Sequence, residues 1–133
     1  MAYPTQYRYT KEHEWIEAKG AAATIGITDY AQHELGDVVF VELPKVGTPL
    51  TAGKTFSSVE SVKAVSEIYA PANGEVTEAN ATLQDKPETI NSDPHGAGWL
   101  VKVKLANPAD VNELMDATAY EAYIAEKQKE ASA

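Results

Sequence analysis

The sequence predicts a mainly β fold, a sandwich of short strands with a short helix near residues 28–35 and helices at the C-terminal end. Short runs rich in Val, Ile, Thr and aromatic residues recur along the chain and are bounded by glycine or proline, as strands usually are. Two strand-then-turn units end in Pro-x-x-Gly at residues 44–47 and 71–74, and they lie on either side of a segment that predicts a hairpin. This repetition favours a quasi-symmetric sandwich.

Composition and charge limit the classes of function open to the chain. Its 133 residues are 44% hydrophobic, which suits one domain over residues 1–133, with a helical extension over about 107–128. Because 20 acidic residues outnumber 11 Lys and Arg, the net charge is −9, which argues against binding to nucleic acid or to an anionic membrane. The chain has no cysteine, hence no disulfide and no thiolate metal site. It shows no targeting or membrane-span pattern, so we expect a cytoplasmic bacterial protein; a mature organelle form is less favoured because the chain begins with Met1.

Five segments outside the hairpin predict strands. They are residues 14–17, 22–27, 38–43, 74–80 and 99–105. The run 38–43 is almost entirely apolar and β-branched or aromatic, so we expect it to be the most buried strand. Residues 81–98 are rich in proline and glycine and predict a loop.

A two-turn helix is predicted over residues 28–36. Thr28 suits the N-cap, Asp29 suits the positive end of the helix, and Gly36 suits the position after its last turn.

Two further helices are predicted near the C-terminus. Asn107 suits the N-cap of the first helix, and Pro108 directly after it suits the first helical position. The second, capped by Asp116 or Thr118, runs towards Gln128 and presents an apolar face to the sandwich. The charged tail over residues 126–133 is expected to fray.

The segment 55–70 has two interpretations. Glu60 with Lys63, and Lys63 with Glu67, have the spacing of ion pairs on a helix. Against a helix, the segment is rich in Val, Ser and Thr, and each half has the length of one strand. We therefore predict a hairpin that holds Lys63 at its tip.

An exposed lysine at a turn ordinarily serves solubility. Val62 and Ala64, however, leave Lys63 as the one charge on the tip, and Glu60 and Glu67 stand further back, where they can mark the loop for a modifying enzyme. A primary amine on a four-carbon stem is a good point for acylation.

The motif Glu60-Ser61-Val62-Lys63-Ala64-Val65-Ser66-Glu67 resembles the lipoylation motif of the glycine cleavage system H protein family. Other blocks resemble the same family, follow its order and cover nearly the whole chain: residues 12–15, 26–32, 35–44, 91–94, 98–100 and 120–124. The resemblance implies a barrel-sandwich hybrid, the fold of lipoyl and biotinyl carriers. The chain departs from the family pattern at Thr89, where leucine is common, and at His95, where an aromatic residue is frequent.

The resemblance also implies a carrier protein of glycine catabolism, not an enzyme. Lys63 would hold (R)-lipoic acid as an amide installed by lipoylating enzymes, with Glu60, Val62 and Ala64 flanking it in the motif. This swinging arm would carry the aminomethyl group of glycine from glycine decarboxylase to aminomethyltransferase, and dihydrolipoyl dehydrogenase would reoxidise it. The family shelters the loaded arm in a cleft, where Glu14 and Glu67 are candidates to pair with the amine, unless they are ordinary surface charges. We expect a monomer.

No catalytic motif is found, and no metal site is expected, because His13, His33 and His95 lack the spacing of metal ligands. Other carriers are alternatives: lipoyl domains of 2-oxoacid dehydrogenases usually have flexible linkers, and biotin carriers usually have methionine on both sides of the lysine. An H-like protein that relays octanoyl or lipoyl groups would keep Lys63. Outside the carriers, an unmodified β-sandwich binding module remains open.

Overall fold

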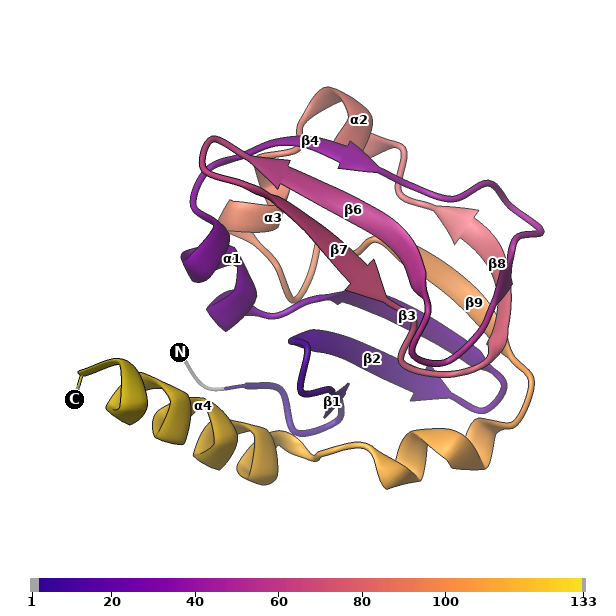
Figure 1. The fold of residues 1–133 in the computed structure, drawn as a ribbon. Helices are drawn as coiled ribbons and strands as arrows, with labels where there is room; N and C mark the ends of the chain where they lie inside the picture. Colours follow the sequence, from indigo (N-terminus) through magenta and orange to yellow (C-terminus); the bar gives the residue numbers. More distant parts are fainter. Residues whose placement is uncertain (1–2, 133) are drawn as a thin grey trace.

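Two antiparallel β-sheets stack against each other in the computed structural model, which describes residues 3–132 (Figure 1). The larger sheet has six strands, in the spatial order β1 (Arg8–Tyr9), β2 (Glu14–Lys19), β3 (Ala22–Ile27), β9 (Val101–Leu105), β8 (Gly74–Ala79) and β5 (Pro49–Leu50). The smaller sheet has three, in the order β4 (Val38–Glu42), β6 (Thr55–Ser61) and β7 (Val65–Tyr69). Over the described residues the sheets form an open sandwich, not a closed barrel, and the predicted mainly β class is confirmed.

The main core lies between the two sheets. In β9, Val101, Val103 and Leu105 are buried while the two lysines between them are exposed, so the strand turns one face inward, as predicted. The smaller sheet adds buried side chains to the same cluster: Val41, Val59 and Ile68. Each such side chain removed from water stabilises the fold by about 2 kcal/mol, which makes this layer the main source of stability.

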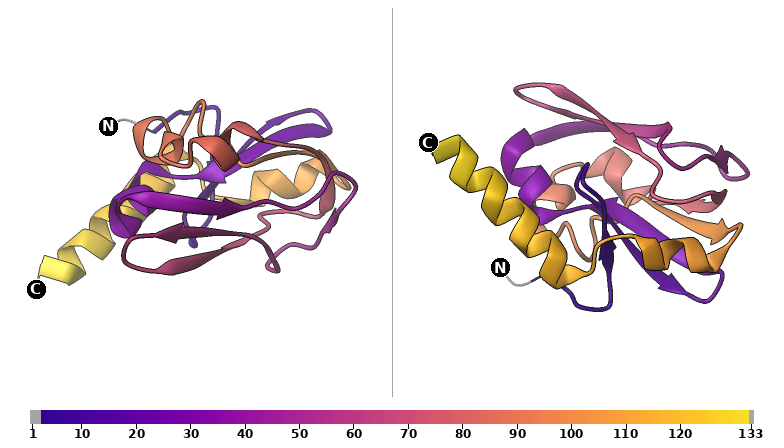
Figure 2. Two further views of the ribbon diagram at one scale, coloured as in Figure 1. Left: turned by 90° about the horizontal axis from the view of Figure 1, so that it is seen from above. Right: turned by 60° about the horizontal axis from the view of Figure 1, so that its bottom comes forward.

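A second, aromatic cluster lies on the opposite side of β2. Successive residues of a strand point to opposite faces, so Ile16 enters the main core while Trp15 enters this cluster. Helix α4 (Ala117–Ser132) covers it and runs beside the N-terminal segment (Figure 2). The rings of Tyr9 and Tyr120 stack there with their centroids 4.7 Å apart. The predicted packing of the C-terminal helix on the sandwich is therefore confirmed.

Helix α1 (Asp29–Leu35) begins and ends where the sequence predicts. The Thr28 hydroxyl accepts a hydrogen bond from the Ala31 amide at 3.2 Å, as an N-cap does. At the other end the Gly36 amide donates to the Gln32 carbonyl at 3.0 Å. Gly36 has a φ of 78°, a conformation that glycine adopts without strain.

The C-terminal caps are also as predicted. Asn107 accepts from the Ala109 amide at 3.2 Å and starts a 3₁₀ helix, Pro108–Glu113. Asp116, and not Thr118, caps α4 by accepting from the Ala119 amide at 2.8 Å. The backbone of the tail is helical as far as Ser132, in keeping with its Ala, Glu, Lys and Gln content, and the predicted fraying stays a prediction; Ala133 lies outside the described residues. None of the helices described combines the length and the apolar character needed to cross a bilayer.

The prediction that residues 38–43 form the most buried strand is wrong. Val39 is 49% exposed and Phe40 is 50% exposed. The register between β4 and β6 shifts between Val38 and Phe40, so an extra residue interrupts the alternation of the strand. Two consecutive apolar side chains therefore face outward.

The predicted loop over residues 81–98 contains two four-residue helices, α2 (Thr82–Asp85) and α3 (Thr89–Ser92). Leu83 and Ile90 anchor them in the main core. Helices of a single turn are too short to show a 3.6-residue pattern, so the sequence gives no periodic signal for them.

Candidate functional site

Lys63 lies at the exposed tip of a hairpin, as the sequence predicts. Strands β6 and β7 pair up to Glu60 and Val65, which leaves a short connection between them. The hydroxyl of Ser61 accepts hydrogen bonds from the amides of Lys63 and Ala64, both at 3.2 Å. The Ser61 amide donates to the Ala64 carbonyl at 2.8 Å. These contacts fix the turn and leave the Lys63 side chain exposed.

The tip rests on the loop that follows α1. The Val62 amide donates to the carbonyl of Asp37 at 3.0 Å. The stem of Lys63 passes over Gly36, where an added Cβ would lie 3.1 Å from the Lys63 Cε. A residue without a side chain therefore allows the lysine stem to lie close to the C-terminal end of α1.

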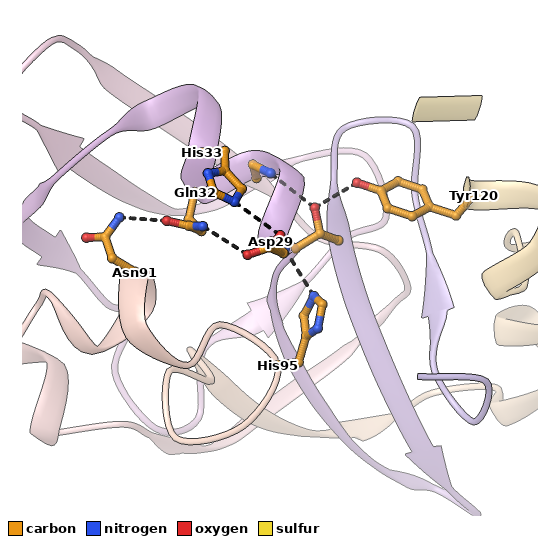
Figure 3. Close-up of polar contacts among 8 residues, drawn as sticks. Asp29, Gln32, His33, Asn91, His95 and Tyr120 are labelled. Carbon is orange, nitrogen blue, oxygen red and sulfur yellow. Dashed lines mark hydrogen bonds and ion pairs between the residues drawn. The ribbon is translucent and has the colours of Figure 1, made fainter. Parts of the chain in front are cut away.

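Asn91 of α3 holds this loop in place. Its side-chain nitrogen donates to the Gly36 carbonyl and to the Gln32 side-chain oxygen, both at 2.9 Å, and Figure 3 shows the contact with Gln32. Its oxygen accepts from the Val38 amide at 2.9 Å. The resemblance included Asn91 only as part of a motif, and no pattern in the sequence indicates these partners, because they lie far away in the chain.

The N-terminal end of α1 is fixed by His95. The His95 Nε2 accepts from the Asp29 amide at 3.0 Å, so this nitrogen is unprotonated (Figure 3). Burial lowers the pKa of His95, which favours the neutral form that this bond requires. At this departure from the family pattern, an imidazole therefore serves as a cap for the helix.

Tyr120 connects α4 to the same end of α1. Its hydroxyl lies 2.7 Å from the Thr28 hydroxyl and 2.8 Å from the Nδ1 of His13 (Figure 3 shows Tyr120 pointing towards α1). Burial lowers the pKa of His13 to about 4. The two ends of α1, and with them the support of the hairpin tip, are thus held by Asn91, His95 and Tyr120.

A groove of about 160 Å³ lies between α1 and β7. Its lining includes apolar side chains from the helix, the strand and the end of β3: Ile27, Ala31, Leu35 and Ile68. Its polar lining comes from Glu12, His13, Glu34 and Ser66. Leu35 directly precedes Gly36, so the apolar part of the groove lies next to the place where the Lys63 stem passes.

The two carboxylates proposed from the sequence for a cleft do not line this groove. Glu14 is 1% exposed, and it accepts from the Thr10 hydroxyl at 2.5 Å and the Tyr69 amide at 3.3 Å. Burial raises the pKa of its carboxyl to about 7. Glu67 is exposed on β7 and pairs across the sheet with Ser58. Neither residue lines the groove, whose carboxylates are Glu12 and Glu34.

The comparisons with known proteins agree on one family. The family model described as glycine cleavage H-protein matches residues 7–127. The glycine cleavage system H protein of Acidobacterium capsulatum is 58% identical over 127 residues, which cover 96% of this chain and 98% of the relative. That of Koribacter versatilis is 57% identical over 127 residues, with the same coverage of 96% and 98%. The crystal structure of a glycine cleavage system H protein from Mycobacterium marinum is similar with a TM-score of 0.83 and 39% identity, covering 95% of this chain and 99% of that one.

Proposed function

The chain belongs to the glycine cleavage H-protein family, the lipoyl carriers of the glycine cleavage system, and on that premise we propose that Lys63 holds (R)-lipoic acid through an amide bond. The observation that carries the proposal is the place of Lys63 on the exposed tip of a hydrogen-bonded turn. Among the side chains that the structure describes, its ammonium group forms no ion pair, so the amine is open to an acylating enzyme. Members of this family are carrier components and not catalysts.

When bound, the lipoyl group would supply a disulfide able to accept the aminomethyl group of glycine. We propose that glycine decarboxylase loads it, aminomethyltransferase unloads it and dihydrolipoyl dehydrogenase reoxidises it. The chain itself supplies a fixed attachment point. Tethering converts each encounter with a partner active site into a local event at high effective concentration. Ser61, Asp37 and Asn91 serve this role because their hydrogen bonds hold the turn and the loop beneath it.

The groove between α1 and β7 fits a hydrocarbon arm that starts at Lys63. Its apolar lining gives an alkyl chain a surface on which to leave water. Gly36 keeps the path from the lysine stem to the groove clear of a side chain. We therefore propose that the arm lies in this groove, away from water, when it is not bound in the active site of a partner enzyme.

Glu12 and Glu34 are the carboxylates best placed to pair with a cationic amine carried on the arm, because both line the groove. An opposite charge nearby keeps an amine in its charged form. The role of Glu14 and Glu67 in a cleft stays a prediction. The Glu14 carboxylate accepts hydrogen bonds from Thr10 and Tyr69 inside the protein, and Glu67 is exposed on β7.

Mass measurement tests the attachment site. The protein is made in a host fed lipoate and is examined as the intact chain and as mapped peptides. We expect one lipoyl addition on Lys63, its loss in Lys63→Arg, and its retention in Lys54→Arg, which alters an exposed lysine at the other end of the same hairpin. A wild-type chain that stays unmodified beside an active lipoate ligase would leave the unmodified binding module as the better hypothesis.

A second assay separates a glycine cleavage carrier from a relay of lipoyl groups. Lipoylated wild-type protein is added to glycine decarboxylase, and glycine-dependent exchange of carbon dioxide is followed. Exchange that needs the lipoylated chain supports the glycine cleavage role. Absence of exchange with a fully lipoylated chain would favour the relay.

A further inference from the structure

Four exposed apolar side chains gather around the tip of the β6–β7 hairpin. Val39 is 49% exposed, Phe40 50%, Val62 68% and Val65 63%. Phe40 and Val65 lie in one row across the smaller sheet, on either side of Glu60. The Val62 amide donates a hydrogen bond to the carbonyl of Asp37, which precedes β4. We name these four residues the tip patch; the start of β4 and the hairpin turn lie together at one end of the smaller sheet (Figure 1).

The β-bulge at the start of β4 produces this patch. Without the extra residue, the alternation of the strand would turn either Val39 or Phe40 into the core. The register shift between Val38 and Phe40 instead leaves both side chains half exposed. The most apolar run of the sequence thus contributes to the surface beside Lys63, where exposed apolar side chains bring no stability to the folded chain.

Four carboxylates lie within or around the tip patch, and we name these four residues its acidic border. Glu60 lies within its row, and Asp37 precedes β4. Glu42 and Glu67 lie on either side of Ser58, two residues further along the sheet and on the same face. All four are exposed, and none forms an ion pair with another side chain in the described part of the structure. Glu42 and Glu67 are each a diagonal neighbour of Glu60, at a spacing of about 7–8 Å. Like charges at this spacing repel, so the border also brings no stability by itself.

An apolar centre with an acidic border fits a protein partner of complementary character. Apolar patches with a polar rim mark interaction surfaces. A second copy of this chain fits poorly, because pairing two tip patches would set acidic borders against each other. A partner with an apolar contact surface and a rim of Lys and Arg satisfies both features.

We propose that the tip patch and its acidic border form the docking surface for the enzymes that receive the arm of Lys63, at the basic-rimmed entrance of their active sites. The inference rests on the proposed function, because it is the arm that makes docking at this place productive. Lys63 lies directly beside Val62, so an enzyme that covers the patch has the attachment point at its entrance.

Glycine decarboxylase is the probe that tests the patch. Carriers are first shown by mass to be fully lipoylated and by thermal unfolding to be folded. Exchange of carbon dioxide is then measured against carrier concentration. For Phe40→Ser and Val65→Ser we expect the KM for the carrier to rise about tenfold with little change in kcat, since central apolar contacts dominate interfaces. Val46→Ser is the control, because Val46 is 66% exposed but lies outside the patch, and its KM should equal that of the wild type.

The acidic border has its own test in the same assay. The double variant Glu42→Gln, Glu67→Gln should raise the KM and flatten its dependence on salt, because it removes charge that attracts a basic rim. Glu75→Gln alters an exposed carboxylate on β8 of the larger sheet and should change neither.

These outcomes separate the inference from the function on which it rests. If the patch variants are lipoylated and match the wild-type KM, the docking surface is wrong while the carrier function stands. If the wild-type chain is not lipoylated, the proposed function itself fails. Sedimentation that shows a wild-type dimer dispersed by Phe40→Ser would also overturn the inference, since the patch would then bind a second copy.

Discussion

The side-chain nitrogen of Asn91 donates a hydrogen bond of 2.9 Å to the carbonyl of Gly36, 55 positions away in the sequence. The Asn91 oxygen accepts from the Val38 amide, so one side chain holds both ends of the loop between α1 and β4. The residue between them, Asp37, accepts from the amide of Val62 at the hairpin tip. The position of the tip therefore depends on a residue of another helix.

Asn91→Ala should destabilise the fold by about 2 kcal/mol, because it leaves partly buried polar groups without partners. Urea unfolding measures the loss, and hydrogen exchange at the Val62 amide should be faster in the variant. Ser92→Ala is the matched control, since the exposed Ser92 hydroxyl contacts only a carbonyl of its own helix and should cost less than about 0.5 kcal/mol. An unchanged Val62 exchange rate would show that Asn91 does not support the tip.

Tyr120→Phe should lower the free energy of unfolding by about 1–2 kcal/mol. The stacked ring stays in place, because the variant lacks only the hydroxyl that contacts Thr28 and His13. Thermal unfolding is a suitable measurement. Tyr123→Phe provides the comparison: its hydroxyl donates to the Lys11 carbonyl at 3.2 Å on the surface, and its loss should have little effect. Equal losses in the two variants would contradict a special role of Tyr120.

Gly26→Ala should destabilise the larger sheet, because the added Cβ would lie 2.6 Å from the Trp15 ring. Overpacking of this kind costs about 1–3 kcal/mol. In a Trp15→Phe background the same substitution should cost less, since the smaller ring leaves room. A double-mutant cycle in urea gives the coupling, and strictly additive losses would show that the ring and the new methyl group do not meet.

Burial of Glu14 should make stability fall as pH rises. Its pKa is raised from 4.5 to about 7, so between these values the folded chain holds more protons than the unfolded chain. The contribution of the carboxyl is therefore fully present below 4.5 and is lost as pH rises through 7, by about 3 kcal/mol. His13, whose pKa is lowered, acts in the opposite direction, so the test compares variant and wild type.

Glu14→Gln removes the charge and should become more stable relative to the wild type as pH rises from 5 to 8. Chemical unfolding at a series of pH values measures the difference. A difference that stays constant over this range would mean that the buried carboxyl titrates normally.

Local signals in the sequence predicted much of the fold. Thr28 and Asp116 cap their helices with their own neighbouring amides, and the hairpin around Lys63 follows from its Val, Ser and Thr content. Such features depend on residues a few positions apart, which a sequence pattern displays directly.

The missed features depend on distant pairings. The bulge that exposes Phe40 depends on how β4 pairs with β6, and the apolar content of β4 does not determine that pairing. Asn91 and His95 act through bonds to Gly36 and Asp29, and a polar residue in a loop looks the same whether or not such a partner exists. For the groove, Glu12 and Glu34 come together only through tertiary folding.

The aromatic cluster beneath α4 has a consequence for synthesis of the chain. Its first members, Tyr3, Tyr7 and Tyr9, leave the ribosome before strands β2 to β9, whereas Tyr120 and Ile124 leave it after them. During translation the early tyrosines therefore have no helix to cover them, although the strands of the sandwich core up to β9 are already complete. The second core can close only after α4 has been synthesised.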